Sequence, residues 1–229
     1  MGRFDLYGDL FDPASQGRMR AFFLNDVAPL GVIRDYARGT SIDHLSMRAS
    51  MGVVVRGCVA KSLVSCGGRE KLLYFLRPGE VFGEMDLLDG GSFPFVLQAR
   101  ERSSVSFVSK RDVEALLDRR PDRYGLFVHS MTRKFRIVSL QLANSVFNGS
   151  LGQVAEALLR LASCSDPSGD GPVVLRLTQQ ELASNIGCSR VAVARALREL
   201  IEMGVIERRG REMVLRDLGR LSGLRDGVR

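Results

Sequence analysis

Three arginines near the end of the chain, Arg190, Arg195 and Arg198, have the side chains and spacing needed to recognise base edges. A guanidinium group can donate two hydrogen bonds to O6 and N7 of guanine, a contact that discriminates against other bases by roughly 1–3 kcal/mol. Val191 and Ala194 would lie on the same side of a helix and offer methyl groups that can contact thymine. This group of side chains predicts direct readout of duplex DNA.

The apolar residues between the arginines determine where the arginines point. They recur at i, i+3, i+4 and i+7 and must face the core from one side of a helix. These apolar residues are Val193, Ala196, Leu197 and Leu200. The arginines then lie on the opposite face, and those at the start of the helix would enter the major groove.

A shorter helix precedes this one. Thr178 and Glu181 form a capping box, in which the hydroxyl accepts from the third helical amide while the carboxylate reaches back to the cap amide. Gly187-Cys188 makes a tight turn, and Ser189 can cap the next helix. The spacing predicts a helix-turn-helix. The alternative is a pair of helices that only pack against each other.

The segment that follows predicts a β-hairpin, or wing. Two strand-like stretches flank Arg209-Gly210-Arg211, and Arg211 would contact phosphate near the tip. Residues 189–211 hold six arginines and three glutamates, a local excess that suits a phosphate backbone. The net charge of +7 is weaker evidence, because residues 1–150 carry +5 of it. A solvated helix face is the alternative explanation of the local charge.

Residues 30–108 alternate short β-branched and aromatic stretches with glycine-containing turns. Adjacent glycines at 67–68 predict a hairpin, because glycine supplies the positive φ angles of a tight connection. Pro78-Gly79 predicts a second turn. This spacing is typical of a β-barrel or jelly roll.

Helical patterns follow the strands. Ser109 and Asp112 predict the start of a short helix that ends near Arg120, and Pro121 opens a longer one of about 25 residues with a heptad-like apolar stripe. A stripe of this length predicts pairing with a second copy of the chain, and the alternative is packing on the barrel. The predicted dimer interface comprises Tyr124, Phe127, Met131, Phe135, Val138 and Leu142.

Together these patterns predict an α+β chain with a β jelly-roll sensor domain at 1–120, a dimerisation helix at 121–147 and a winged helix-turn-helix at 148–229. The 229 residues, 45% hydrophobic and 26% charged, suffice for two folded cores. No apolar stretch approaches the roughly 18 residues of a membrane span, and the start lacks the pattern of a signal peptide. We therefore expect a cytoplasmic protein with no membrane partner.

Catalytic and metal-binding patterns are missing from the sequence. The four cysteines form no CxxC pair, there are two histidines, and no Ser/His/Asp arrangement or phosphate loop is present. We expect neither an enzyme nor a metal site.

The chain resembles the Crp/Fnr family of bacterial transcription regulators. The resemblance rests on GEVFGEMDLL in the β-rich half, the long helix, LTQQELASNIGCSRVAVARALREL and the wing, and it covers roughly residues 30–216. It implies a homodimer that regulates transcription by binding a palindromic operator in duplex DNA, with RNA polymerase as a further partner. A cyclic-nucleotide-binding module attached to an enzyme or channel is the rival interpretation, but such modules lack the segment 178–216.

The resemblance also assigns residues. The base-reading arginines of relatives fall on Arg190 and Arg195, while a family glutamate falls on Val191, which removes an acceptor for cytosine N4 and predicts a different half-site. By the same resemblance, Thr178, Gln179, Ser189 and the wing-tip Arg211 would hold the DNA backbone. The predicted DNA-contacting residues are Thr178, Gln179, Gln180, Ser189, Arg190, Val191, Ala194, Arg195, Arg198 and Arg211.

For the sensor, the resemblance implies a cassette in which a Gly-Glu pair precedes an Arg-Ser pair that binds the cyclic phosphate. Gly83-Glu84 is present, but the Arg-Ser position falls on Phe93-Pro94, which offers no guanidinium group and, at proline, no N–H. We therefore do not expect cyclic AMP in that mode. The candidate effector pocket comprises Phe82, Gly83, Glu84, Phe93, Phe95, Val138 and Ser139, the last two at a family position for purine contacts.

Other effectors stay open at this stage. An iron–sulfur cluster is not expected, because the first cysteine is Cys58 and relatives with clusters place their cysteines near the N-terminus. Haem is a minor alternative, with His44, His129, Cys58 or a methionine as axial ligand. The remaining alternatives are an apolar small molecule and no ligand at all. In each case the sensor state would alter how the paired 121–147 helices pack and hence how the recognition helices are spaced.

Overall fold

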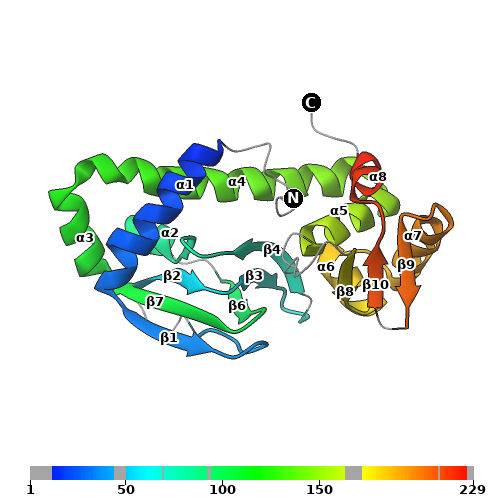
Figure 1. Ribbon diagram of the computed structural model, residues 1–229, viewed down its shortest axis with the longest axis horizontal. Coiled ribbons are helices and arrows are strands. Elements are labelled where there is room, and N and C mark those ends of the chain that lie inside the picture. The colour runs from blue at the N-terminus through cyan, green and yellow to red at the C-terminus, as the bar shows by residue number, and fades with distance from the viewer. Residues whose placement is uncertain are drawn as a thin grey trace. The chain divides into compact units, whose positions relative to one another are not determined.

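The computed structural model describes residues 12–43, 50–68, 70–91, 94–162, 172–210 and 212–225. The chain forms two compact units. The first, called the sensor unit below, contains the described residues up to 68 and residues 72–137, and the second, the C-terminal unit, is built on residues 138–225. The long helix α4 contributes to both units (Figure 1). In the described part of the chain, no helix is long and apolar enough to cross a membrane.

The sensor unit begins with helices. Asp12 caps the first of them by accepting a hydrogen bond from the amide of Ser15 at 2.8 Å. Phe22 and Phe23 then turn into the core and pack edge-on against Phe127 of α4, with ring centroids 6.1 and 5.0 Å away. These elements are α1 (Pro13–Phe22), the π-helical turn η2 (Phe23–Val27) and η3 (Ala28–Leu30).

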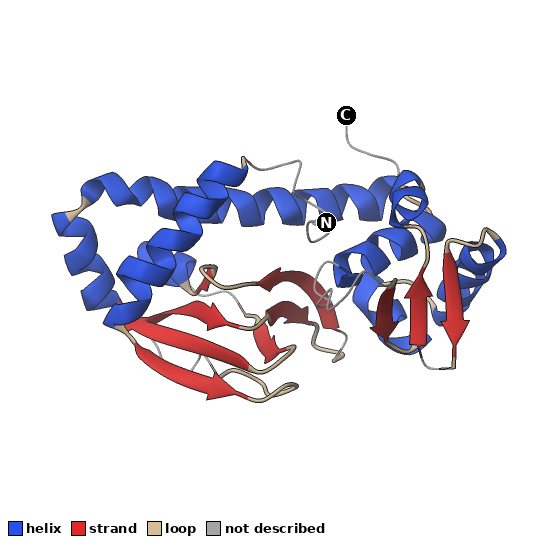
Figure 2. Ribbon diagram, viewed as in Figure 1, coloured by secondary structure: helices blue, strands red, loops and turns tan. Residues whose placement is uncertain are grey.

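Two antiparallel sheets follow, drawn as the red arrows of the sensor unit in Figure 2. One has the strand order β1-β7-β2-β5 and the other β4-β3-β6. Gly68 and Gly79 both have positive φ angles, 74° and 80°, so both predicted turns are confirmed. The strands are β1 (Val32–Tyr36), β2 (Ser50–Arg56), β3 (Val59–Val64), β4 (Glu70–Leu76), β5 (Val81–Phe82), β6 (Val96–Ala99) and β7 (Ser103–Ser109).

Helices complete the sensor unit. Ser109 caps α3 by accepting from the amide of Asp112 at 3.2 Å, as its sequence predicts. Buried Glu80 joins three elements, because its carboxylate accepts from Arg20 of α1 at 2.6 Å, lies 3.3 Å from Arg133 of α4 and accepts from the amide of Arg77. The helices are α2 (Glu84–Asp89), α3 (Lys110–Arg119), the short η5 (Pro121–Arg123) and α4 (Tyr124–Phe147).

The predicted stripe on α4 needs one correction. Phe127 is 1% exposed and belongs to the core of its own chain, so it is not available for a second copy. Neighbouring Val128 is exposed instead, and Phe135 is 72% exposed. The apolar residues on the open face of the helix are Tyr124, Val128, Phe135, Val138, Leu142 and Val146, with Met131 half-buried among them.

The C-terminal unit is a helical core with a small sheet of strand order β8-β10-β9. The core is aliphatic and draws on every helix of the unit from α5 onward. Its elements are α5 (Ser150–Ala162), β8 (Val173–Arg176), α6 (Gln179–Ile186), α7 (Arg190–Glu202), β9 (Ile206–Arg209), β10 (Glu212–Leu215) and α8 (Leu218–Gly223). The α+β class with a β-rich first half, a long helix and a winged helix-turn-helix is therefore confirmed.

Candidate nucleic-acid interface

The start of α6 is fixed by the predicted capping box. The hydroxyl of Thr178 accepts from the amide of Glu181 at 3.1 Å, and the Glu181 carboxylate accepts from the amide of Thr178 at 2.5 Å. Gly187 ends the helix with a φ of 76°, a conformation that glycine adopts without strain. Ser189 then caps α7 by accepting from the amide of Ala192 at 3.2 Å. Three residues between two capped helices make a compact helix-turn-helix.

Cys188 sits in the turn between the two helices. Its thiol donates to the side-chain oxygen of Gln153 at 3.0 Å, which ties the turn to α5. Burial raises the pKa of this thiol, so it stays protonated at neutral pH. Cys188 therefore acts here as a structural residue of the turn.

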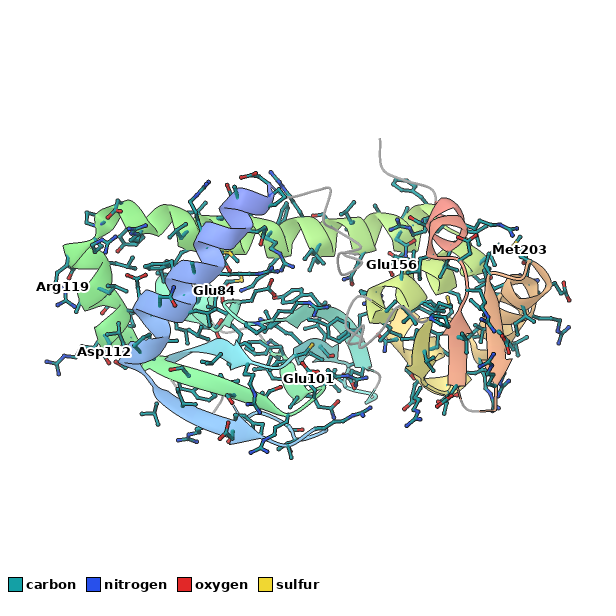
Figure 3. All side chains as sticks on the ribbon, viewed as in Figure 1. Glu84, Glu101, Asp112, Arg119, Glu156 and Met203 are labelled. Atoms are coloured by element: carbon teal, nitrogen blue, oxygen red, sulfur yellow. The ribbon has the colours of Figure 1, made fainter. Side chains whose placement is uncertain are left out.

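Helix α7 has one buried and one open face. The four predicted apolar residues are all buried, from Val193 to Leu200. Arg190, Arg195 and Arg198 are exposed, and Val191 is 80% exposed. Within the described residues, no carboxylate forms an ion pair with any of these three arginines. They are available for an external anion without loss of an existing contact. Met203, labelled in Figure 3, follows the end of the helix.

The wing carries both paired and unpaired arginines. Glu207 accepts from Arg209 at 2.7 Å and also from Arg216. Hydrogen bonds from these two arginines lower the pKa of Glu207 to about 2, so the carboxylate stays charged at any pH near neutrality. Arg208 instead donates to the backbone oxygen of Gly210 at 3.2 Å, and no described carboxylate forms an ion pair with it. Arg209 shares the Glu207 carboxylate with Arg216, whereas Arg208 has no ion-pair partner among the described residues.

A groove of about 670 Å³ lies between α7, the start of α6 and the wing. It brings together six of the predicted DNA-contacting residues with Arg208, which the sequence prediction did not include. The sequence could have indicated Arg208 as a further DNA-contacting residue, because it lies in a hairpin strand one residue before the paired Arg209. Glu212 also lines the groove, but Arg176 neutralises it at 2.7 Å. The predicted residues in the groove are Thr178, Gln179, Gln180, Arg190, Ala194 and Arg198.

The other predicted DNA-contacting residues lie elsewhere. Ser189, Val191 and Arg195 are exposed at or near the start of α7 but do not line the groove. A duplex that follows the open face of α7 could reach them as well as the groove. Arg211, the predicted tip of the wing, lies outside the described residues.

In the sensor unit, Glu84 has a partner from its own chain. It is labelled in Figure 3 and is 1% exposed, and Lys134 of α4 donates to its carboxylate and, at 2.7 Å, to the backbone oxygen of Val81. Gly83 before it has a φ of 79°, which lets the chain turn from β5 into α2. The Gly-Glu pair thus joins the β5–α2 turn to α4. The sequence prediction missed Lys134, although it lies seven residues after buried Phe127 and so on the same face of the helix.

The aromatic residues of the candidate pocket have different roles. Phe82 is a core residue, because its ring fills the space that a side chain at Gly52 would need and packs edge-on against Phe107 at 5.9 Å. Phe95 is buried, and its ring face lies 3.7 Å from the ammonium group of Lys61, another residue that the sequence prediction missed. Phe93 lies outside the described residues.

The remaining pocket candidates do not form a cluster that the structure defines. Val138 and Ser139 are both on the open side of α4 and belong to the C-terminal unit. Of the haem-ligand candidates, His129 is half-buried on α4 and Cys58 is a buried free thiol, while His44 lies outside the described residues. Burial and the nearby Arg133 lower the pKa of His129. Among the described residues, no group of three potential metal ligands occurs.

Comparisons with protein families match both halves of the chain. Residues 33–120 match the family described as "Cyclic nucleotide-binding domain", and residues 152–224 match the "Crp-like helix-turn-helix domain". The two matches fall on the sensor unit and on the unit that carries α6, α7 and the wing.

Curated relatives cover most of the chain. A cyclic AMP receptor protein of Thermus thermophilus is 33% identical over 174 residues, which is 76% of this chain and 78% of the relative. A cAMP-activated global transcriptional regulator of Salmonella typhimurium is 27% identical over 189 residues, 80% of this chain and 89% of the relative. Among solved structures, a c-di-GMP responsive global regulator of Xanthomonas campestris has a TM-score of 0.69 at 21% identity, covering 90% of this chain and all of that one.

Proposed function

Since this chain belongs to the Crp/Fnr family of DNA-binding transcription regulators and is not an enzyme, we propose that it works as a homodimer that reads a specific palindromic sequence. The observation that carries the proposal is the open face of α7, where Arg190, Arg195 and Arg198 are exposed and form no ion pair with a described carboxylate. A groove with polar side chains from the start of α6 lies beside this face. Exposed guanidinium groups on the first two turns of such a helix are suited to base edges.

Within this interface the residues divide by chemistry. Arg190 and Arg195, with Val191 and Ala194, would contact base edges, and Arg198 lies farther along the helix. Thr178, Gln179, Gln180 and Ser189 lie around the N-termini of the two helices, where hydroxyl and amide groups suit phosphate. Arg208 adds an unpaired cation from the wing, and Arg211 would extend it. The half-site would differ from that of relatives with a carboxylate at the Val191 position.

Dimerisation would use the open stripe of α4. The helix has 24 residues and is therefore about 36 Å long. Its exposed apolar side chains recur at spacings of three and four, which is the pattern of a paired seam. We assign Tyr124, Val128, Met131, Phe135, Val138 and Leu142 to this seam, with Val128 in the place first given to Phe127.

The sensor domain at 1–120 would control the DNA-binding domain at 148–229 through the paired helices at 121–147. Two observations disfavour cyclic AMP in the usual mode: Pro94 occupies the phosphate-binding position, and Glu84 is already paired with Lys134. The chain's first cysteine, Cys58, leaves no N-terminal cluster for iron and sulfur. The regulator would act in the bacterial cytoplasm, with RNA polymerase as the partner that its DNA-bound form helps or hinders.

The DNA reading can be tested by selecting bound sequences from a random duplex pool with the purified full-length protein. We expect a two-fold palindrome whose half-sites lie about 34 Å apart. Arg190→Ala and Arg195→Ala should each relax the motif at one position per half-site. Arg220→Ala, which removes an exposed arginine of α8 away from the groove, should leave it unchanged. Failure to enrich any sequence, or equal effects of all three variants, would contradict the proposal.

The paired helices can be tested by light scattering of Phe135→Asp. A charge placed in an apolar seam is strongly unfavourable, so the variant should be monomeric and should lose binding to the palindrome. Ala115→Asp adds the same charge at an exposed position of α3, outside the stripe on α4, and it should remain a dimer. A dimeric, DNA-binding Phe135→Asp variant would show that the seam lies elsewhere.

A further inference from the structure

The interior of the sensor unit holds a cation without an anion. Lys61 of β3 is 8% exposed, and its ammonium group lies 3.7 Å from the ring centre of Phe95 and 5.9 Å from that of Tyr74. No described carboxylate forms an ion pair with it, and no described oxygen accepts a hydrogen bond from it. Among the described residues, the close partners of its ammonium group are the two aromatic faces.

The neighbouring charges do not compensate for Lys61. Glu84 is already paired with Lys134, which is also buried, so this pair is neutral as a whole. Glu84 and, more weakly, Asp86 of α2 attract the Lys61 ammonium group, but each attraction is smaller than the repulsion from Lys134. Burial first and Lys134 second lower the pKa of Lys61 from 10.5 to about 8. At neutral pH Lys61 is therefore a buried positive charge with no ion-pair partner among the described carboxylates.

The buried charge of Lys61 needs an explanation, because buried charges in folded proteins are normally paired or bind a ligand. Aromatic faces attract a cation but do not supply the hydrogen-bond acceptors that an ammonium group loses on leaving water. A methionine or leucine would pack against Phe95 and Tyr74 without that loss. Packing alone therefore does not account for a lysine at this position.

We propose that Lys61 is the anchor of the effector site and that it binds the acid group of a small organic monoanion. This inference rests on the proposed sensor role of the unit and names the class of its ligand. The negative charge of the ligand follows from the Lys61 ammonium group, which forms no ion pair with a described carboxylate. The rest of the ligand follows from Phe95 and Tyr74. Their ring faces suit a flat apolar or aromatic group beside the acid, as in an aromatic carboxylate or a phenolate.

The same residues argue against a cyclic nucleotide. A ribose would need the Glu84 carboxylate, which Lys134 holds together with the backbone oxygen of Val81. Breaking that buried pair to admit the sugar would leave the Lys134 ammonium group with the Val81 oxygen but without its carboxylate. A monoanion at Lys61 leaves the Lys134–Glu84 pair in place.

The first test is the thermal stability of the unliganded full-length protein at pH 7. Because Lys61 is a buried charge with no anion, Lys61→Met should melt at a higher temperature than the wild type. Lys110→Met, which removes an exposed lysine of α3, should melt within about one degree of the wild type. If Lys61→Met or Lys61→Leu melted at a lower temperature or failed to fold, Lys61 would be an ordinary packing residue and the proposal would be overturned.

The second test adds probes to the same proteins. Benzoate, phenylacetate and salicylate should include at least one compound that raises the melting temperature of the wild type in a saturable way, with benzamide and phenylacetamide inactive as neutral analogues. No such rise should occur in Lys61→Met, and Lys110→Met should respond like the wild type. The proposal would be overturned if none of the three acids raised the melting temperature, or if they raised it equally in Lys61→Met. A rise caused by cyclic AMP that persists in Lys61→Met would also overturn it.

These measurements contain no DNA, so their outcome is independent of the sequence selection described above. Failure of the lysine experiments would leave the palindrome and its arginine dependence intact. Failure of the selection would remove the proposed DNA specificity without changing the ligand chemistry of Lys61.

Discussion

The two units of the protein place their unpaired cations in opposite environments. On α7 the three arginines extend into water, where an unpaired guanidinium group is well solvated and stabilises nothing by itself. In the sensor unit Lys61 lies inside, near the buried Lys134–Glu84 pair, and an unpaired charge in that environment lowers stability. A cation that serves binding therefore costs little folding stability on the exposed face of α7. A cation that serves binding from the interior of the sensor unit costs much more. The following predictions test this difference.

The largest effect should come from breaking the buried pair. Lys134→Met leaves the Glu84 carboxylate and the Val81 oxygen without their donor, so we expect a loss of about 3–5 kcal/mol in the free energy of unfolding by denaturant. The double variant Lys134→Met/Glu84→Leu should recover most of this loss, because both charges are then gone. Lys110→Met, which disrupts the exposed pair with Glu114, should change stability by under about 1 kcal/mol. Equal losses at the exposed and buried pairs would remove the basis of the comparison.

A smaller effect should appear as a pH dependence. Below pH 8, Lys61 is charged in both the folded and the unfolded chain, and the wild type carries the full penalty of burial. Between pH 8 and about 10.4 the folded state has released the proton while the unfolded state keeps it, so stability rises with pH. Across this window the wild type should gain about 3 kcal/mol relative to Lys61→Met. Parallel stability curves for the two proteins, measured by urea unfolding from pH 7 to 10.5, would show that the folded side chain titrates normally.

The smallest effect concerns the wing. Arg208→Ala removes an unpaired cation, so it should weaken binding to all DNA sequences alike and reduce the slope of log affinity against log salt by about one. Arg209→Ala removes a cation that is ion-paired with Glu207, a carboxylate it shares with Arg216, and its salt slope should change by less. Titrations of the selected operator at several salt concentrations distinguish the two. A larger change for Arg209 would mean that its ion pair opens on DNA.

The helix-turn-helix could be predicted because its determinants are local. The capping box of Thr178 and Glu181, the glycine at 187 and the cap at Ser189 each act within four residues, and the structure has all of them. The strand turns at Gly68 and Gly79 were predictable for the same reason. Local chemistry of this kind does not depend on what the segment later packs against.

The errors arose where tertiary packing decides. The stripe on α4 includes Phe127 by spacing alone, yet Phe22 and Phe23 from more than 100 residues earlier cover it. Lys61 was missed because both faces of β3 are buried, so alternation gives no sign of where its ammonium group lies. Only the fold shows that Lys61, Phe95 and Tyr74 meet. The spacing of apolar residues within a segment predicts which residues share a face of the helix or strand. What packs against that face is determined by the rest of the chain.

The Glu80 cluster bears on how the sensor unit is made. Its two arginines, Arg20 and Arg133, lie at opposite ends of the unit's sequence, and the pairing of β1 with β7 joins Val32 to Phe107. A chain emerging from the ribosome cannot complete either contact until most of the unit has been synthesised. The Glu80 carboxylate cannot contact Arg133 before α4 has been synthesised. We therefore expect the sensor unit to fold in one late step, after the first half of α4 has left the ribosome.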